Sequence, residues 1–173
     1  MSEQRHLLSV LVENGPGELA RIVGLFSGRG FNIDSLSVNT TLEASKSRVV
    51  LTTRGDARVV EQITKQLNKL VKVHKVWHPK GDSHLERELC LATVRAGTPA
   101  AREELDSVLK LVGGRVVSFA AGLFTVELSG TEAEIGQFLE MVRPLGVKNM
   151  VRSAPIAIRR PTAEGDDAPT RGA

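Results

Sequence analysis

The chain has 173 residues, of which 41% are hydrophobic and 25% charged, and this composition is typical of a soluble globular protein. The formal net charge is only +3 and the charges are interspersed, which argues against a nucleic-acid binder held by phosphate contacts. A lone cysteine, Cys90, excludes an internal disulfide, no apolar run approaches the ~20 residues of a membrane span, and no signal-peptide core is present, so we expect a cytoplasmic protein.

The first 80 residues alternate between strand and helix patterns. Leu19, Ile22, Val23 and Phe26 recur at helical spacing and predict one apolar helix face. Strands are expected at 5–13, 32–40, 47–53 and 71–76, and helices at 16–29 and from 55 onward. The order β-α-β-β-α-β is the split-βαβ or ferredoxin-like plan.

The same order returns after a polar break at 78–83, which we interpret as a linker. Thr131 and Glu134 have the spacing of a capping box at the start of a helix. Strands are expected at 88–95, 116–119, 123–128 and 147–158, and helices at 99–112 and 131–142. The sequence therefore predicts an α+β protein with two tandem ferredoxin-like domains, residues 1–80 and 84–159, and a disordered tail at 160–173.

A short strand-to-helix turn is the first candidate site. Pro16 suits the first helical position, which makes Gly15 the expected N-cap, and glycine supplies no side-chain oxygen to the free N–H groups. A helix start of this kind attracts a carboxylate or a phosphate, and Asn14 offers an amide donor and acceptor beside it, which together suit an amino acid. The turn therefore predicts an amino-acid site, although such junctions also occur without a ligand. Its residues are Asn14, Gly15, Pro16, Gly17, Glu18 and Leu19.

Asn32 and Ile33, at the entry to the second predicted strand, are the second part of the candidate site. Asn32 can be a simple turn residue. Small open sheets often hide an edge strand by pairing with a second copy, so we expect a homodimer through the first domain. In that dimer Asn32 of one chain can face the glycine turn of the other, with Ile33 and Leu19 as aliphatic walls for a branched side chain.

Other site types receive less support. A metal site could draw on His74, His78 and His84, but no cysteine or acidic cluster completes a ligand set, and we expect no metal. Cys90 lies in an apolar run, which is typical of a core residue. RNA-recognition domains share the element order, but the third strand lacks the aromatic residues that stack bases, and no P-loop is present. No cluster of acids, histidine and cysteine indicates catalysis.

Two sets of residues resemble a known family. The turn Asn14-Gly15-Pro16-Gly17-Glu18-Leu19 is similar to the effector-binding turn of ACT domains, the βαββαβ amino-acid sensors of biosynthetic enzymes. Residues 5–158 resemble the small regulatory subunits of acetolactate synthase, also called acetohydroxyacid synthase. The strings that carry this resemblance are Leu25-Phe26-Ser27-Gly28-Arg29-Gly30-Phe31-Asn32-Ile33-Asp34-Ser35-Leu36, Lys65-Gln66-Leu67-Asn68-Lys69-Leu70-Val71 and Arg87-Glu88-Leu89.

The resemblance implies a subunit without an active site. Such a subunit binds the catalytic large subunit, raises its activity and confers feedback inhibition by valine. It also implies that Asn14, Gly17 and neighbouring backbone hold the effector and that Asn32 and Ile33 of the partner chain complete the pocket. Thiamine diphosphate, Mg²⁺ and FAD would belong to the catalytic partner, with no cofactor in this chain. The alternative is a stand-alone ACT-type amino-acid sensor for another enzyme, and the choice among valine, leucine and isoleucine stays open.

Overall fold

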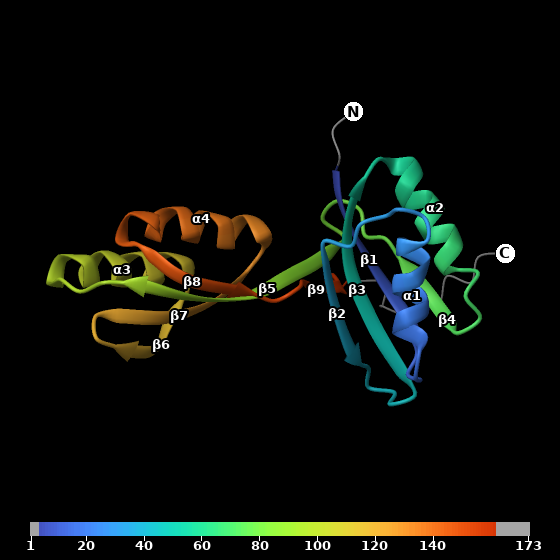
Figure 1. Ribbon diagram of the computed structural model, residues 1–173, viewed down its shortest axis with the longest axis horizontal. Coiled ribbons are helices and arrows are strands. Elements are labelled where there is room, and N and C mark those ends of the chain that lie inside the picture. Colours follow the sequence, from blue (N-terminus) through green and yellow to red (C-terminus); the bar gives the residue numbers. More distant parts are fainter. Residues whose placement is uncertain (1–3, 162–173) are drawn as a thin grey trace. The chain divides into compact units, whose positions relative to one another are not determined.

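Two α+β units make up the computed structural model, which describes residues 4–161 (Figure 1). The first unit includes the chain up to Leu85 and the segment that begins at Ala157, and the second is Glu86–Ile156. Most of the tail predicted at 160–173 lies outside the described residues. Among the described residues, no helix is long and apolar enough to cross a membrane.

The first unit is a four-stranded antiparallel sheet with two helices on one face (Figure 1). The strand order is β2-β3-β1-β4, which leaves β2 and β4 at the edges. Its elements are β1 (Gln4–Glu13), α1 (Glu18–Ser27), β2 (Ser35–Thr40), β3 (Lys46–Gly55), α2 (Ala57–Leu67) and β4 (Val73–Trp77).

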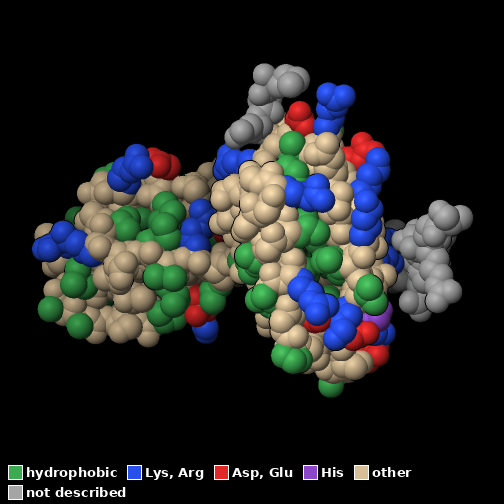
Figure 2. Space-filling model, turned by 45° about the vertical axis from the view of Figure 1, so that its right-hand side comes forward, with side chains coloured by type: hydrophobic (Ala, Val, Ile, Leu, Met, Phe, Trp, Pro, Cys, Tyr) green, Lys and Arg blue, Asp and Glu red, His purple; other side chains and the backbone are tan. Residues whose placement is uncertain are grey.

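Alternation along the strands separates the two faces of this sheet. Successive residues of a strand point to opposite faces of the sheet, so Leu8 and Val10 of β1 share one face. Both are fully buried there and belong to one core with Ile22 and Phe26 of α1. The helix α2 begins at its cap Asp56, whose Oδ1 accepts the N–H of Val59 at 2.9 Å. The charged residues remain outside this core, and Figure 2 shows acidic and basic side chains as neighbours on the visible surface.

The second unit repeats the plan with its own core. The sheet order is β6-β7-β5-β8, and the capping box is present, with Thr131 and Glu134 each accepting the other's backbone N–H. Cys90 is fully buried in this core. The elements are β5 (His84–Arg95), α3 (Pro99–Val112), β6 (Arg115–Ala120), β7 (Leu123–Gly130), α4 (Glu132–Val142), a 3-10 turn (Arg143–Leu145) and β8 (Val147–Arg152). The predicted α+β fold with two ferredoxin-like units is confirmed.

Some predicted boundaries were wrong. β2 begins at Ser35 rather than at Asn32, and Val71 is 97% exposed and precedes β4. The single closing strand predicted at 147–158 is two strands, β8 and β9 (Ile156–Arg159), separated by a segment that contains Pro155, which has no N–H to donate to a ladder. β9 pairs with β5, and Ala157 packs on Leu7 and Val50 of the first unit.

Candidate functional site

The turn between β1 and α1 differs from the prediction at its helix start. The predicted N-cap at Gly15 with Pro16 in the first turn is wrong, because α1 begins at Glu18 and its N-cap is Gly17. Gly17 has φ 83° and ψ −8°, a left-handed conformation that glycine adopts at little cost and other residues avoid. The chain therefore needs two more residues than predicted to turn from the strand into the helix.

Asn14 is fixed against the turn that joins β2 and β3. Its backbone N–H donates to the carbonyl oxygen of Ser45 at 2.7 Å, and its side-chain Nδ2 donates to the carbonyl oxygen of Ala44 at 3.0 Å. The amide nitrogen therefore serves the fold, and the amide oxygen is the group suited to accept a hydrogen bond from a ligand.

The start of α1 is suited to an anionic group. The first N–H groups of a helix have no acceptor within it, and the described residues provide no side-chain cap for α1. The N–H of Glu18 makes only a long contact of 3.4 Å to the carbonyl oxygen of Gly15. A Cβ added at Gly17 would have no atom within 4 Å, so the space beside the turn is open. The remaining N–H groups and the helix dipole can receive a carboxylate there.

Glu18 and Lys72 form a charged contact that the sequence did not predict. The Glu18 side chain is only 7% exposed, and its Oε1 lies 3.4 Å from Nζ of Lys72 and 3.5 Å from Nη1 of Arg21. Lys72 also contacts Oε2 of Glu13 at 3.6 Å. It comes from the loop between α2 and β4, far away in sequence, and no local pattern marks this contact. Glu18 is therefore a residue that holds the turn through Lys72 and Arg21.

Asn32 lies in the loop before β2 and is held by its neighbours. Its Nδ2 donates to Oδ1 of Asp34 at 2.7 Å, and its carbonyl oxygen accepts from the Thr53 hydroxyl at 2.6 Å. Ile33 is half-buried and packs against the core of its own unit, whereas Leu19 is 39% exposed. Of the two predicted aliphatic walls, Leu19 is thus the more accessible.

One chain alone does not bring the two halves of the candidate site together. Asn14 precedes α1 and Asn32 follows it, and this helix of 10 residues is about 15 Å long at 1.5 Å per residue. The two asparagines therefore belong to opposite ends of α1.

Comparison with known proteins gives the family. The model described as an AHAS small subunit-like ACT domain matches residues 8–75, and the model described as the small subunit of acetolactate synthase matches residues 87–161. The probable acetolactate synthase small subunit of Methanothermobacter thermautotrophicus is 40% identical over 160 residues, which is 92% of this chain and 95% of that protein. The chain belongs to the acetolactate synthase small-subunit family.

Other small subunits of acetolactate synthase align with a similar share of this chain. The Escherichia coli acetolactate synthase isozyme 3 small subunit is 38% identical over 157 residues, or 90% of this chain and 96% of that one. The crystal structure of the acetolactate synthase small subunit from Thermotoga maritima is 30% identical and has a TM-score of 0.81, covering 92% of this chain and 99% of that one. The first unit of this small-subunit family member is therefore an ACT domain.

The histidines of this family member do not form a metal centre in the described part of the chain. No three His, Cys, Asp or Glu residues there are grouped to hold an ion. His78 instead packs edge-on against His6, with ring centroids 5.3 Å apart, and His84 contacts Trp77. Burial lowers the pKa of His78, and the nearby His6 and Lys80 lower it further.

Proposed function

We propose that this chain is the regulatory subunit of an acetolactate synthase, activates the catalytic large subunit and makes it sensitive to valine. Family membership over both units supports the regulatory role. The observation that carries the effector site is the uncapped start of α1, entered through left-handed Gly17 beside the fixed amide of Asn14. The proposed site comprises Asn14, Gly15, Pro16, Gly17, Glu18 and Leu19 of one chain with Asn32 and Ile33 of another.

Each part of an α-amino acid has a counterpart in this set. The carboxylate accepts from the N–H groups at the start of α1, where the helix dipole is positive. The ammonium donates to the side-chain oxygens of Asn14 and of Asn32 of the partner subunit. The isopropyl group of valine lies against Leu19, which is 39% exposed and loses that exposure on binding.

Pairing of two chains through β2 would place the two halves of the site together. Among the strands that the structure describes, β2 is at the edge of its sheet and pairs only with β3. In an antiparallel pairing about a two-fold axis at the middle of β2, the loop before one β2 lies opposite the 41–45 turn after the other. The carbonyl oxygens of Ala44 and Ser45 in that turn hold Asn14. Asn32 of the partner subunit therefore arrives beside Asn14, although the two are at opposite ends of α1 within a chain.

Regulation then follows from a preference of the ligand for one arrangement of the dimer. A ligand shifts an equilibrium only by its difference in affinity for the two states, and typical couplings are about 1–3 kcal/mol. Thiamine diphosphate, Mg²⁺ and FAD are assigned to the catalytic subunit in this proposal, and the small subunit contributes binding and coupling.

Calorimetric titration of the full chain with valine, leucine and isoleucine tests the site. Valinamide, which lacks the carboxylate, is the matched control. We expect saturable binding of valine and at least about tenfold weaker binding of valinamide, because an ionic hydrogen-bond acceptor is lost. Equal affinity for the two ligands, or no binding of any of the three amino acids, would contradict the proposed site.

Capture of the acetolactate synthase large subunit by the tagged chain tests the regulatory role separately. The captured enzyme should become more active and should lose activity when valine is added. Valine binding without capture of the large subunit would instead indicate a stand-alone amino-acid sensor.

A further inference from the structure

A groove lies on the face of the first unit that carries its helices, between the last turn of α1 and the C-terminal end of α2. Its volume is about 530 Å³, and all of its lining residues belong to the first unit. Gly24, Gly28 and Arg29 come from the α1 side, and Gln66, Lys69 and Leu70 from the α2 side. None of the residues proposed for the amino-acid site lines the groove, so the two sites are distinct.

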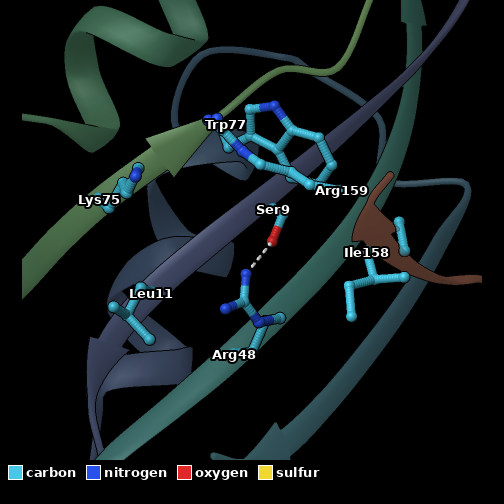
Figure 3. A pocket seen from close by; sticks show the side chains of 8 residues that line it. Ser9, Leu11, Arg48, Lys75, Trp77, Ile158 and Arg159 are labelled. Carbon is cyan, nitrogen blue, oxygen red and sulfur yellow. Dashed lines mark hydrogen bonds between the residues drawn. The ribbon is translucent and has the colours of Figure 1, made fainter. Parts of the chain in front are cut away.

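A hollow on the helix-free side of the same sheet differs from this groove, because its arginines have partners within the chain (Figure 3). The Ser9 hydroxyl accepts from Nη1 of Arg48 at 3.1 Å, and the guanidinium carbon of Arg159 lies 5.1 Å from the centroid of the Trp77 ring. The contact between Arg159 and Trp77 joins β9 to β4. These side chains therefore serve the fold of the first unit.

The cations of the groove, Arg29 and Lys69, have no such partners among the described residues. Neither forms an ion pair or a side-chain hydrogen bond there, and no Asp or Glu is among the described residues that line the groove. Each follows the end of its helix, where the helix dipole favours a positive charge. The dipole accounts for the position of the two cations and leaves their hydrogen-bond donors available to a carboxylate from another molecule.

Gly24 is a residue that the fold of the described chain does not explain. It lies inside α1, where glycine is less favourable than alanine. It is exposed, it is not among the glycines with positive φ, and an added Cβ would have no atom within 4 Å. The missing side chain does allow the backbone of another molecule to approach the helix closely. Gly28, one helical turn further along, extends this small surface.

The two sides of the groove come from stretches that carry the family resemblance. All of its lining residues except Gly24 fall within 25–36 and 65–71, through which the sequence resembles acetolactate synthase small subunits. Core packing accounts for Phe26 and Leu67 of these stretches, which are fully buried. It does not account for the exposed Arg29 and Lys69. Two available cations beside a glycine surface are complementary to the backbone and carboxylates of an acidic segment.

We propose that this groove binds an acidic segment of the catalytic large subunit. The backbone of the segment lies against Gly24 and Gly28, and its carboxylates contact Arg29 and Lys69. The choice of this partner rests on the proposed function, in which the chain holds and regulates the large subunit. α1 then has the effector at its start and the large subunit at its end, so a shift of α1 on effector binding also changes the contact with the large subunit.

Capture of the large subunit by the tagged full chain tests the groove through Gly24→Gln. A glutamine side chain fills the space over the helix and favours a helix more than glycine does, so the thermal unfolding midpoint should not fall. We expect this variant to bind the large subunit at least about tenfold more weakly than the parent does. Gly136→Gln is the matched control, because Gly136 lies inside α4 and its added Cβ also has no atom within 4 Å. Equal capture by Gly24→Gln and the parent, or equal weakening in Gly136→Gln, would overturn the proposal.

Charge variants test the acidic character of the bound segment. Arg29→Gln and Lys69→Gln should each weaken capture about tenfold, because each loses a charge-assisted hydrogen bond, and Arg29→Lys should keep part of the affinity. Arg58→Gln makes the same charge change at an exposed residue of α2 outside the groove and should bind as the parent does. Equal weakening by Arg58→Gln would show general charge attraction and would overturn the assignment.

Valine titration and size-exclusion chromatography separate the groove from the other proposed contacts. The groove variants should bind valine with the affinity of the parent, because none of the substituted residues belongs to the amino-acid site. If they also capture the large subunit as the parent does, the groove proposal fails and the regulatory role stands. If the parent captures no large subunit, the proposed function fails and the groove proposal fails with it. A changed oligomeric state of Gly24→Gln alone would assign the groove to a second copy of the chain and overturn its assignment to the large subunit.

Discussion

Gly17 has a left-handed backbone conformation and also belongs to the proposed effector site. Replacing it with Asp puts a carboxylate at the position proposed for the carboxylate of the effector. The left-handed φ of 83° costs a non-glycine residue about 1 kcal/mol, and Asp tolerates it better than most residues. We expect Gly17→Asp to fold, to activate the catalytic subunit and to resist valine, with an affinity lower by at least about tenfold. Calorimetry and inhibition curves of the holoenzyme measure both effects.

Gly81→Asp is a matched control for this substitution. Gly81 also has a positive φ, 53°, and an added Cβ there would likewise have no atom within 4 Å. The control carries the same new charge and a similar backbone cost, away from the turn. It should bind valine as the parent does, and the site assignment fails if the two variants lose inhibition equally.

His78 provides a pH-dependent prediction. Its burial, with His6 and Lys80 nearby, lowers the pKa of His78 below its ordinary value of 6.5. The folded chain therefore binds this proton less readily than the unfolded chain. The resulting stability is fully present above pH 6.5 and is lost as the pH falls through the lowered pKa of His78.

Unfolding by urea at a series of pH values measures this contribution. In His78→Gln the free energy of unfolding should fall less than in the parent between about pH 8 and pH 5, because glutamine does not titrate. His74→Gln removes an exposed histidine of β4, the strand that ends just before His78, without touching the contact between His78 and His6. If both variants flatten the pH dependence equally, the effect does not come from the contact between His78 and His6.

At the scale of elements, the sequence correctly predicted the helix starts that are determined by capping residues next to them. α3 has the predicted bounds because Thr98 caps it and Pro99 opens it, and the capping box of Thr131 opens α4 in the same way. The start of α1 was misplaced because Gly17, rather than Pro16, makes the turn from strand to helix. The motif itself marked Asn14 and Gly17, but a sequence pattern does not give the conformation of a glycine.

Long-range contacts account for the remaining differences. β9 depends on the packing of Ala157 against Leu7 and Val50, which are far from it in sequence. The contact of Lys72 with Glu18 also joins separate elements, and so does the cation–π contact of Arg159 from β9 with Trp77 from β4. Periodicity describes one element at a time and gives no sign of such pairings.

The ion pair between β5 and β8 gives a prediction about one sheet. Oε2 of Glu88 accepts from Arg152 Nε at 3.0 Å and Nη2 at 2.6 Å, and the Glu88 side chain is 6% exposed. Arg152→Met leaves this buried carboxylate without that partner, so the free energy of unfolding should fall by about 1–3 kcal/mol. Urea unfolding followed by circular dichroism measures the loss.

Arg115→Met is the matched control in the same sheet. Arg115 makes the same two-nitrogen contact with Oε1 of Glu127, but its side chain is 74% exposed. An exposed pair contributes at most about 1 kcal/mol, so this variant should lose less stability than Arg152→Met. An equal or larger loss in Arg115→Met would contradict the importance given to burial.

In the described part of the molecule, each of the two units has its own main core and its own natural probe. Phe26 belongs to the core of the first unit and Phe138 to that of the second, and both are fully buried. Trp77 is the only tryptophan and Cys90 the only cysteine, so fluorescence reports on the first unit and thiol labelling on the second. Burial raises the pKa of the Cys90 thiol and keeps labelling reagents away from it. Cys90 is therefore labelled only after the core of the second unit opens.

Separate cores predict separate responses to matched core substitutions. Phe138→Leu should lower the urea concentration at which Cys90 becomes labelled and leave the Trp77 transition unchanged, and Phe26→Leu should do the reverse. Each substitution removes buried ring atoms and should cost about 1–2 kcal/mol in its own unit. If either variant shifts both transitions equally, the two units unfold as one cooperative structure. Separate shifts would mean that an effector bound to the ACT unit stabilises that unit by mass action and reaches the second unit only through coupling between them.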